Sequence, residues 1–386
     1  MKWEKKKIED ICLNITSGGT PKSTNEAFYN PQEIPWLKTG EVNYCRIYDT
    51  EKYISKEGLY NSSAKIIPTN SVIVAMYGQG DTAGRVAINK IPLTTNQACC
   101  NLIINDKVAD YEFVYYKLST LYEKMLSLKN GGAQPNLNVK IIKSIEISLP
   151  PLPVQQCIAS ILSAYDDLIE NNQKQINLLE EAAQRLYKEW FVDLRFPGHE
   201  GVKVVDGVPE GWKKEKLIEL AELKAGGDKP KIFSKIKSNI CKVPIFSNGL
   251  ENEGLFGYTD KADIGQESIT ISARGNVGYT CLRREPYLAI VRLICVIPRK
   301  MHISTYLYFY LKHTNYNSNG SAQQQLTIPM IKNTVVCVPD ENMLSDFDDK
   351  ARCYFDLVDA LKSKISSLRE ARDRLLPKLM SGEIEV

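Results

Sequence analysis

The feature that most constrains the fold of this 386-residue chain is that its two halves follow one plan. Trp3-Glu-Lys-Lys-Lys-Ile matches Trp212-Lys-Lys-Glu-Lys-Leu at an offset of 209 residues. Four further matches occur in the same order, pairing residues 17–22 with 226–231, 34–40 with 243–249, 71–78 with 268–275, and 131–137 with 320–326. Five ordered matches predict two copies of one domain, the second shortened in surface loops.

Each copy ends in a long pattern with helical spacing. In the first copy the seam runs through positions 154, 158, 161, 165, 168, 172, 176, 179, 183, 186 and 190. The same spacing, with its irregularity at the same place, returns 189 residues later, although Lys350 and Arg372 interrupt it. Each helix should span about 39 residues, roughly 58 Å. A seam of this length needs a partner, which is either the other helix or the helix's own domain.

The globular parts are predicted to be mixed α and β. Short apolar runs typical of strands cover residues 71–76, 101–104, 145–149, 269–272, 290–297 and 334–338. Runs rich in aromatic residues and leucine predict helices over 111–128 and 304–313. Tyr77-Gly-Gln-Gly-Asp-Thr-Ala-Gly84 is predicted to be the turn between two strands.

Charge alternates along the chain. Residues 1–150 and 201–340 carry net charges of +3 and +6, whereas 151–200 and 341–386 carry −4 and −2. A polyanion should therefore meet the first and third blocks. No apolar run approaches the roughly 18 residues that span a bilayer, and no signal peptide is evident. The ten cysteines lack C-x-x-C spacing, so reduced core cysteines and a cytoplasmic location are expected.

Motifs for chemistry are missing. There is no G-x-x-x-x-G-K-[ST] phosphate loop. The nearest match to the Asn/Asp-Pro-Pro-aromatic tetrapeptide of base amino-methyltransferases is Asn30-Pro31-Gln32, which lacks the second proline and the aromatic residue. Glu222-Leu-Lys224 is too common a triplet to indicate a nuclease, and three histidines give no metal spacing. The chain is therefore predicted to be neither an enzyme nor a holder of a metal or cofactor.

Three segments resemble one protein family. Leu149-Pro-Pro-Leu-Pro-Val-Gln-Gln156 before the first helix, Trp190-Phe-Val-Asp-Leu-Arg-Phe-Pro-Gly-His-Glu200 after it, and Leu375-Leu-Pro-Lys-Leu-Met-Ser-Gly382 at the end are similar to type I restriction–modification specificity subunits. The resemblance covers the whole chain. Val338-Pro-Asp-Glu-Asn342 departs from it, since the second helix lacks the Gln-Gln start.

The resemblance implies an α+β fold of two pseudo-repeated mixed α/β target recognition domains, separated by two long helices in an antiparallel coiled coil. The domains would span 1–150 and 212–341, the helices 151–193 and 342–380, with a linker at 194–211 and a tail at 381–386. Each domain would read half of an asymmetric, interrupted site in double-stranded DNA. Partners would be two methyltransferase subunits using S-adenosylmethionine to methylate adenine N6, and nuclease–translocase subunits using ATP and Mg²⁺.

Polar side chains in the matching loops are the candidate DNA contacts, because amides and guanidinium groups pair with base edges and lysines with phosphates. In the first domain they are Lys22, Lys38, Thr39, Tyr77, Gln79, Arg85, Gln134 and Asn136. In the second they are Lys229, Lys231, Ser247, Asn248, Arg274, Asn276, Gln323 and Gln324. For any one of them, ordinary surface solvation is the competing interpretation.

Three other functions remain open at this point. A tandem RNA-binding scaffold would share the basic blocks. An adhesin with a helical stalk would share the architecture, although ten cysteines and the missing export signal disfavour it. A single-chain restriction–methylation enzyme is disfavoured by the missing catalytic motifs.

Overall fold

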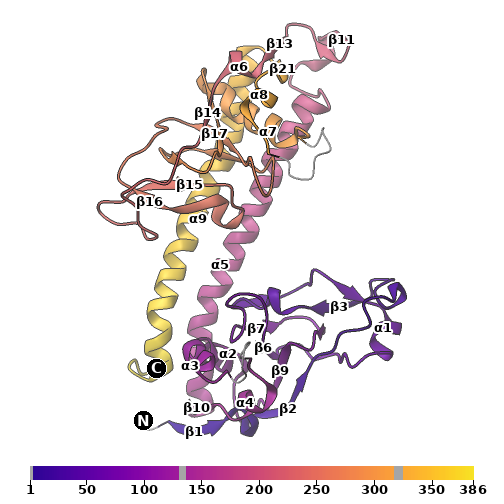
Figure 1. Cartoon of the computed structure of the whole chain (residues 1–386), viewed down its shortest axis with the longest axis vertical. Helices are drawn as coiled ribbons and strands as arrows, with labels where there is room; N and C mark the ends of the chain where they lie inside the picture. The colour runs from indigo at the N-terminus through magenta and orange to yellow at the C-terminus, as the bar shows by residue number, and fades with distance from the viewer. Residues whose placement is uncertain (1–2, 130–135, 317–324) are drawn as a thin grey trace. The chain divides into compact units, whose positions relative to one another are not determined.

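The computed structural model describes residues 3–129, 136–316 and 325–386. It divides into two compact units: unit 1 is Met1–Asn172 with Lys364–Val386, and unit 2 is Gln173–Ser363 (Figure 1). The division cuts both long helices, α5 (Leu152–Tyr187) and α9 (Glu341–Ser381). Each unit therefore consists of a globular domain and a part of each helix.

Unit 1 is built on a five-stranded sheet. Its strands, in spatial order, are β2 (Cys12–Ser17), β9 (Cys99–Ile104), β6 (Val72–Ala75), β7 (Val86–Asn89) and β4 (Cys45–Ile47). A three-stranded sheet and a two-stranded pair add β5 (Tyr53–Ile54), β3 (Ile34–Leu37), β8 (Thr94–Thr95), β1 (Glu4–Lys7) and β10 (Glu146–Leu149). The shorter helices are α1 (Lys56–Tyr60), α2 (Tyr111–Ser119), α3 (Tyr122–Ser127) and α4 (Val139–Lys143). The largest core cluster joins sheet residues to α2 and α5.

Unit 2 repeats this arrangement. A four-stranded sheet contains β14 (Ala221–Ala225), β20 (Ile294–Pro298), β17 (Ser268–Ile271) and β18 (Thr280–Arg283). Beside it are the smaller sheets β16 (Leu255–Thr259), β15 (Val243–Phe246) and β19 (Leu288–Ala289), then β13 (Lys213–Lys216) with β21 (Val335–Val338), and the hairpin β11 (Val204–Val205) with β12 (Val208–Pro209). Its helices are α6 (Leu217–Leu220), α7 (Ser304–His313) and α8 (Ile328–Ile331).

Strand register confirms the internal repeat. Glu4 pairs with Leu149 in unit 1, and their repeat equivalents Lys213 and Val338 pair in unit 2. The parallel pair of β3 with β8 likewise has its counterpart in β15 with β19. The described part of unit 2 has no element in place of α1 or α3. Its strand β18 pairs only with β17, whereas the equivalent strand of unit 1, β7, pairs with both β6 and β4. The shorter second copy has thus lost peripheral elements and kept the central strands.

One alignment in the repeat was wrong by a residue. The sequence matched Ser17 with Gly226, but Gly18 donates to Cys99 O and Gly226 to Leu293 O, so these two glycines are the equivalent ones. The cause is a register shift in β2 next to Leu13, which is 68% exposed and has no counterpart in β14. A bulge of this kind adds one residue to a strand without changing the rest of the ladder.

Two predicted elements also needed correction. The helix expected over 111–128 breaks at Thr120, which caps α2, and resumes as α3. The strand expected over 290–297 begins only at Ile294, because Val291 and Arg292 adopt left-handed φ values of 56° and 60°. The other predicted strands and the helix over 304–313 are confirmed to within a few residues.

The two long helices start differently. The Gln155 side chain, only 1% exposed, accepts from Asp110 N and donates to Pro150 O, which ties the start of α5 to the N-terminal cap of α2. The second helix lacks this glutamine, and Asp340 instead caps α9 by accepting from Met343 N. The departure from the family pattern is therefore a change of capping chemistry.

Within each unit the two helix parts pack antiparallel. In unit 1, Leu379 shares a core cluster with Ile158, and Arg372 pairs with Asp166; in unit 2, Phe347 contacts Tyr187. The higher-numbered part of one helix thus meets the lower-numbered part of the other.

The predicted seam is confirmed at Ile158, Asn172, Ile176, Phe347 and Ile365, which are buried, but it is wrong at Leu168 and Leu357, which are 44% and 53% exposed. The helices also bury positions beside the predicted seam, namely Leu162, Asp166, Ile169, Ala351 and Val358. The buried face of each helix is wider than the predicted seam because each helix is also covered by its own domain. On α5, for example, the Tyr116 hydroxyl donates to Asp166 at 2.5 Å. Arg372, an interruption in the sequence pattern, is the ion-pair partner of that same carboxylate.

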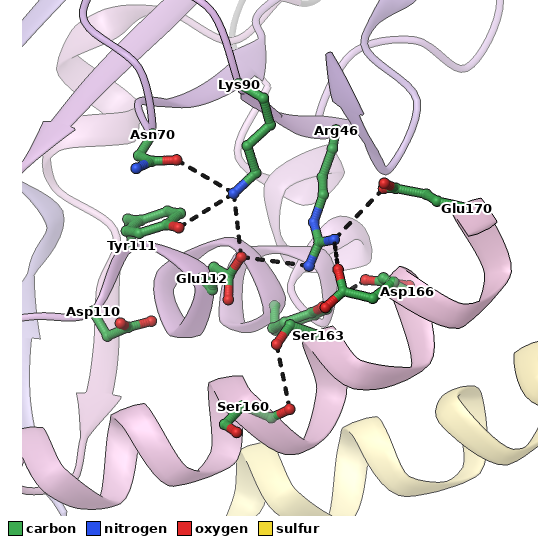
Figure 2. A network of polar contacts seen from close by, with 12 residues as sticks. Arg46, Asn70, Lys90, Asp110, Tyr111, Glu112, Ser160, Ser163, Asp166 and Glu170 are labelled. Atoms are coloured by element: carbon green, nitrogen blue, oxygen red, sulfur yellow. Dashed lines mark hydrogen bonds and ion pairs between the residues drawn. The ribbon is translucent and has the colours of Figure 1, made fainter. Parts of the chain in front are cut away.

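An arginine fastens each domain to its helix. In unit 1, Arg46 on β4 is 6% exposed in its side chain and pairs with Asp167, with Glu170 at 3.7 Å and with Glu112 of α2 at 3.4 Å (Figure 2). Lys90 lies 3.3 Å from the same Glu112 carboxylate.

The described part of unit 2 has no strand equivalent to β4. There Arg284 pairs with two acidic residues of α9 that lie 189 positions after Asp167 and Glu170. It pairs with Asp356 and, at 2.6 Å, with Asp359. The same two helix positions are therefore held by Arg46 of β4 in unit 1 and by Arg284, directly after β18, in unit 2.

Candidate nucleic-acid interface

Three loops of unit 1 that carry predicted contact residues meet at the end of its sheet. Leu137 N donates to Met76 O at 3.1 Å, joining the segment after Asn136 to the β6–β7 hairpin. A side-chain carbon at Gly78 would lie 3.4 Å from the Thr39 hydroxyl, so the turn after β3 borders the same hairpin. Residues separated by almost 100 positions thus form one surface.

Unit 2 brings the equivalent loops together. Leu326 N donates to Ala273 O at 2.9 Å, the counterpart of the bond between Leu137 and Met76. Asn248 accepts from Ala273 N at 2.7 Å, and Arg274 donates to Gln325 at 2.9 Å. These two groups of loops are called the three-loop clusters below.

The candidates of unit 1 differ in their freedom to bind. Lys22, Gln79 and Asn136 are exposed, whereas Lys38, Tyr77 and Arg85 are partly buried and Thr39 is buried. Arg85 donates to Asp81 at 2.6 Å and to Asn43 at 2.9 Å, so two of its donors are already used. Burial of the Tyr77 ring raises the pKa of its hydroxyl, which keeps the group neutral. Gln134 lies outside the described residues.

In unit 2, Lys229, Lys231, Arg274 and Asn276 are exposed and Ser247 is partly buried. Asn248 also donates to Val291 O at 2.7 Å, so its amide bridges two loops. Such an amide supports the surface, because its best-placed donor and acceptor are both occupied. Gln323 and Gln324 lie outside the described residues, and Gln325 is the described glutamine of this segment.

The lysines predicted after β2 and β14 have other neighbours. Near Lys22, Pro21 O accepts from Tyr29, and Gly19 packs against the Ser63–Ala64 backbone. Lys229 Nζ lies 3.4 Å from the centre of the Phe233 ring. The side chains of Lys22 and Lys229 therefore take no part in the polar contacts that build the three-loop clusters.

Sequence reasoning missed the turn at Val291 and Arg292. Both residues are exposed, and a β-branched residue at positive φ is a strained conformation that tends to occur at functional sites. Since Val291 O accepts from Asn248, the Arg292 side chain starts beside the three-loop cluster of unit 2. An arginine inside an apolar run was the only signal in the sequence, and it was read as part of a strand.

Replacing Asn248 by alanine should lower the free energy of unfolding of unit 2 by about 2 kcal/mol, because Ala273 N and Val291 O would both lose their partner. Urea unfolding followed by hydrogen exchange at the two loops measures this. The matched control is Ser247→Ala, which removes a partly buried hydroxyl next door and should change stability by less than about 0.5 kcal/mol. Equal effects of both variants would contradict a bridging role for Asn248.

Comparison with known proteins identifies the family. The family model described as type I restriction modification DNA specificity domain matches residues 1–181 and 209–349. The chain belongs to this family. It is 31% identical to the MjaIX specificity subunit of Methanocaldococcus jannaschii over all of this chain and 94% of that protein. It is 24% identical to the HindI specificity subunit of Haemophilus influenzae, over 99% of both chains.

The fold agrees with the family. The crystal structure of the type I restriction–modification S subunit from M. genitalium superposes with a TM-score of 0.62, at 19% identity, over 98% of this chain and 96% of that one. The two-domain α+β architecture and DNA sequence recognition as a specificity subunit are thereby shown, and the tandem RNA-binding scaffold gains no support.

Neither a membrane-spanning helix nor a metal-binding cluster occurs in the described part of the chain. In the stretches 3–129, 136–316 and 325–386, no helix is both long and apolar enough to cross a bilayer. The same stretches hold no group of three or more His, Cys, Asp or Glu side chains arranged to bind a metal ion.

Proposed function

We propose that each unit reads one half of a bipartite, asymmetric site in double-stranded DNA through its three-loop cluster. The observation that carries this is that the same cluster is built twice with different side chains at equivalent positions. Tyr77 and Asn136 in unit 1 correspond to Arg274 and Gln325 in unit 2. Because different donors and acceptors select different base edges, two such readers favour two different half-sites.

The chain is further proposed to act in the cytoplasm. It would catalyse no reaction itself. It would direct two methyltransferase subunits, which bring S-adenosylmethionine to adenine N6, and nuclease–translocase subunits that consume ATP with Mg²⁺. The relatives' description as specificity subunits supports a non-catalytic role. The 36 residues of α5, about 54 Å long, would serve as a spacer between readers placed on successive groove faces about 34 Å apart.

The decisive experiment is co-expression with its methyltransferase subunit in a host without adenine methylation, followed by mapping of modified adenines across the genome. We expect a bipartite motif with one methylated adenine in each half and an unspecified gap. A short continuous motif would contradict the two-reader proposal. A soluble complex that methylates nothing would contradict the proposal that this chain directs that methyltransferase subunit to DNA.

Gln79 and Arg274 provide a test at residue level. Replacing Gln79 by alanine should change the preferred bases of one half-site, and Arg274→Ala those of the other, each by about 10- to 100-fold in discrimination. Both side chains are exposed, so the fold should be unaffected. Methylation of a library of site variants measures the change. Uniform weakening on all sequences would assign these residues to backbone contact instead.

A further inference from the structure

A lysine-rich loop in unit 2 lies outside the three-loop cluster and includes Lys229 and Lys231, two of the predicted DNA contacts. This loop, residues 229–242, contains five lysines and no acidic residue. It also exposes apolar side chains, with Ile236 78% and Ile240 73% exposed. Burying large apolar side chains is favourable by about 2 kcal/mol each, so two neighbouring exposed isoleucines indicate a surface that is covered by a partner.

The base of the loop is held in place by β16. Ser234 and Tyr258 exchange backbone hydrogen bonds at 2.8 Å in both directions, and the Thr259 hydroxyl donates to Ile232 O at 2.7 Å. Gly257 allows this approach, because a side-chain carbon there would lie 2.6 Å from Ser234 O. The loop is therefore anchored to the sheet at its base, through residues 232–234.

The outer part of the loop is also ordered. Ser238 and Cys241 close a turn, with Ser238 N donating to Cys241 O and Cys241 N to the Ser238 hydroxyl, both at 3.0 Å. Lys235 Nζ lies 3.9 Å from the centre of the Phe256 ring. Ile236 thus precedes this turn and Ile240 lies within it, and both side chains remain largely exposed.

The loop is continuous with the three-loop cluster of unit 2. It follows Gly227 and Asp228; the Gly227 carbonyl accepts from Val291 N, and Val291 O accepts from Asn248. A DNA duplex seated on the cluster would therefore pass near the lysines. Unit 1 offers no equivalent, because residues 18–33 contain Lys22 as their one basic residue together with Glu26 and Glu33.

We propose that the lysine-rich loop is a second DNA contact of unit 2, in which lysines bind phosphates and Ile236 and Ile240 enter the minor groove as an apolar wedge between base steps. The proposal rests on DNA reading by the three-loop cluster. Five cations without a carboxylate match the phosphate backbone, and isoleucine is among the side chains that unstack base steps in this way. The wedge would bend the DNA beside one half-site only.

The test uses the full chain assembled with its methyltransferase subunit, on duplexes that carry the mapped motif and 2-aminopurine at successive steps beside the second half-site. With the unaltered chain, 2-aminopurine fluorescence should rise at one step, reporting its unstacking. The double variant I236S/I240S should abolish this rise and weaken binding about 10-fold, with an unchanged dependence of log K on log salt. The double variant K231Q/K237Q should lower that salt slope by about 2 and weaken binding equally on all sequences.

The control is V204S/V205S, which removes the same kind of exposed apolar surface from the β11–β12 hairpin of the same unit and should leave both readouts unchanged. Wild-type fluorescence, affinity and salt slope in both loop variants would overturn the proposal while leaving the two-reader function intact. Loss of methyltransferase assembly in the loop variants, with free DNA binding retained, would instead identify the loop as a protein-docking surface. An unaltered complex that binds no DNA would contradict the proposed function itself.

Discussion

Replacing Gly18 by alanine is expected to lower the free energy of unfolding of unit 1 by about 3 kcal/mol. A side-chain carbon at this position would lie 2.1 Å from Thr95 O and 2.3 Å from Asn96 O, both backbone atoms that cannot move without shifting β8. Overpacking against backbone of this kind forces displacement of the strand. Peptide-resolved hydrogen exchange should show faster exchange in β3, β8 and β9, with unit 2 unaffected.

Gly40 supplies the matched control, since a side-chain carbon there meets no atom within 4 Å. Gly40→Ala should change stability by less than about 0.5 kcal/mol. In the methylation assay, Gly18→Ala should lose recognition of one half-site at elevated temperature before the other. Equal stability of the two alanine variants would show that the close approach of Gly18 to β8 is not required.

Replacing Arg46 by alanine should lower the free energy of unfolding of unit 1 by about 3 kcal/mol, because it removes a buried cation from three carboxylates at once. Glu112 would be left 17% exposed, with Lys90 as its remaining cation. Chemical denaturation combined with hydrogen exchange across β4 and α5 measures the loss. Arg284→Ala should have a smaller effect on unit 2, since Asp356 and Asp359 are 67% and 55% exposed and can be rehydrated, while its third partner Glu267 keeps its ion pair with Arg352.

Arg185 serves as the control for these charge changes. It forms an i, i+4 pair with Glu181 in which the two side chains are 77% and 53% exposed, and such pairs contribute about 0.3–0.5 kcal/mol. Arg185→Ala should therefore be close to neutral. An Arg46→Ala variant as stable as Arg185→Ala would show that β4 is held to α5 by apolar packing alone.

The internal repeat could be predicted from the sequence because it depends on residue types that are required by the local backbone conformation or by burial. The Trp3 and Trp212 segments, the central strands and the glycine pairs each match within one or two residues of their structural equivalents. The residues at which strands and loops begin and end could not be predicted as accurately. The bulge beside Leu13 changes the alignment by one residue, and it depends on pairing between β2 and β9, which are distant in sequence.

The candidate contact residues show the same division. Exposed positions such as Gln79, Arg274 and Asn136 could be proposed from loop position alone. The occupation of Arg85 by Asn43 and of Asn248 by two backbone groups could not, because these hydrogen-bond partners come from segments that only folding brings together. The same holds for Val291 and Arg292, whose left-handed turn replaces the expected start of a strand.

By itself the sequence determined that two copies of a mixed α/β domain alternate with two long helices, because repeat spacing and apolar periodicity are properties of the chain. Only the tertiary structure decided which face each helix buries. Each long helix is covered both by its own domain and by the other helix. Asp166 is therefore enclosed by Tyr116 and Arg372, whereas Leu168 is 44% exposed. The tertiary structure also decided which loop residues can bind DNA, since a polar group that is already hydrogen-bonded within the fold has fewer donors and acceptors available for a base.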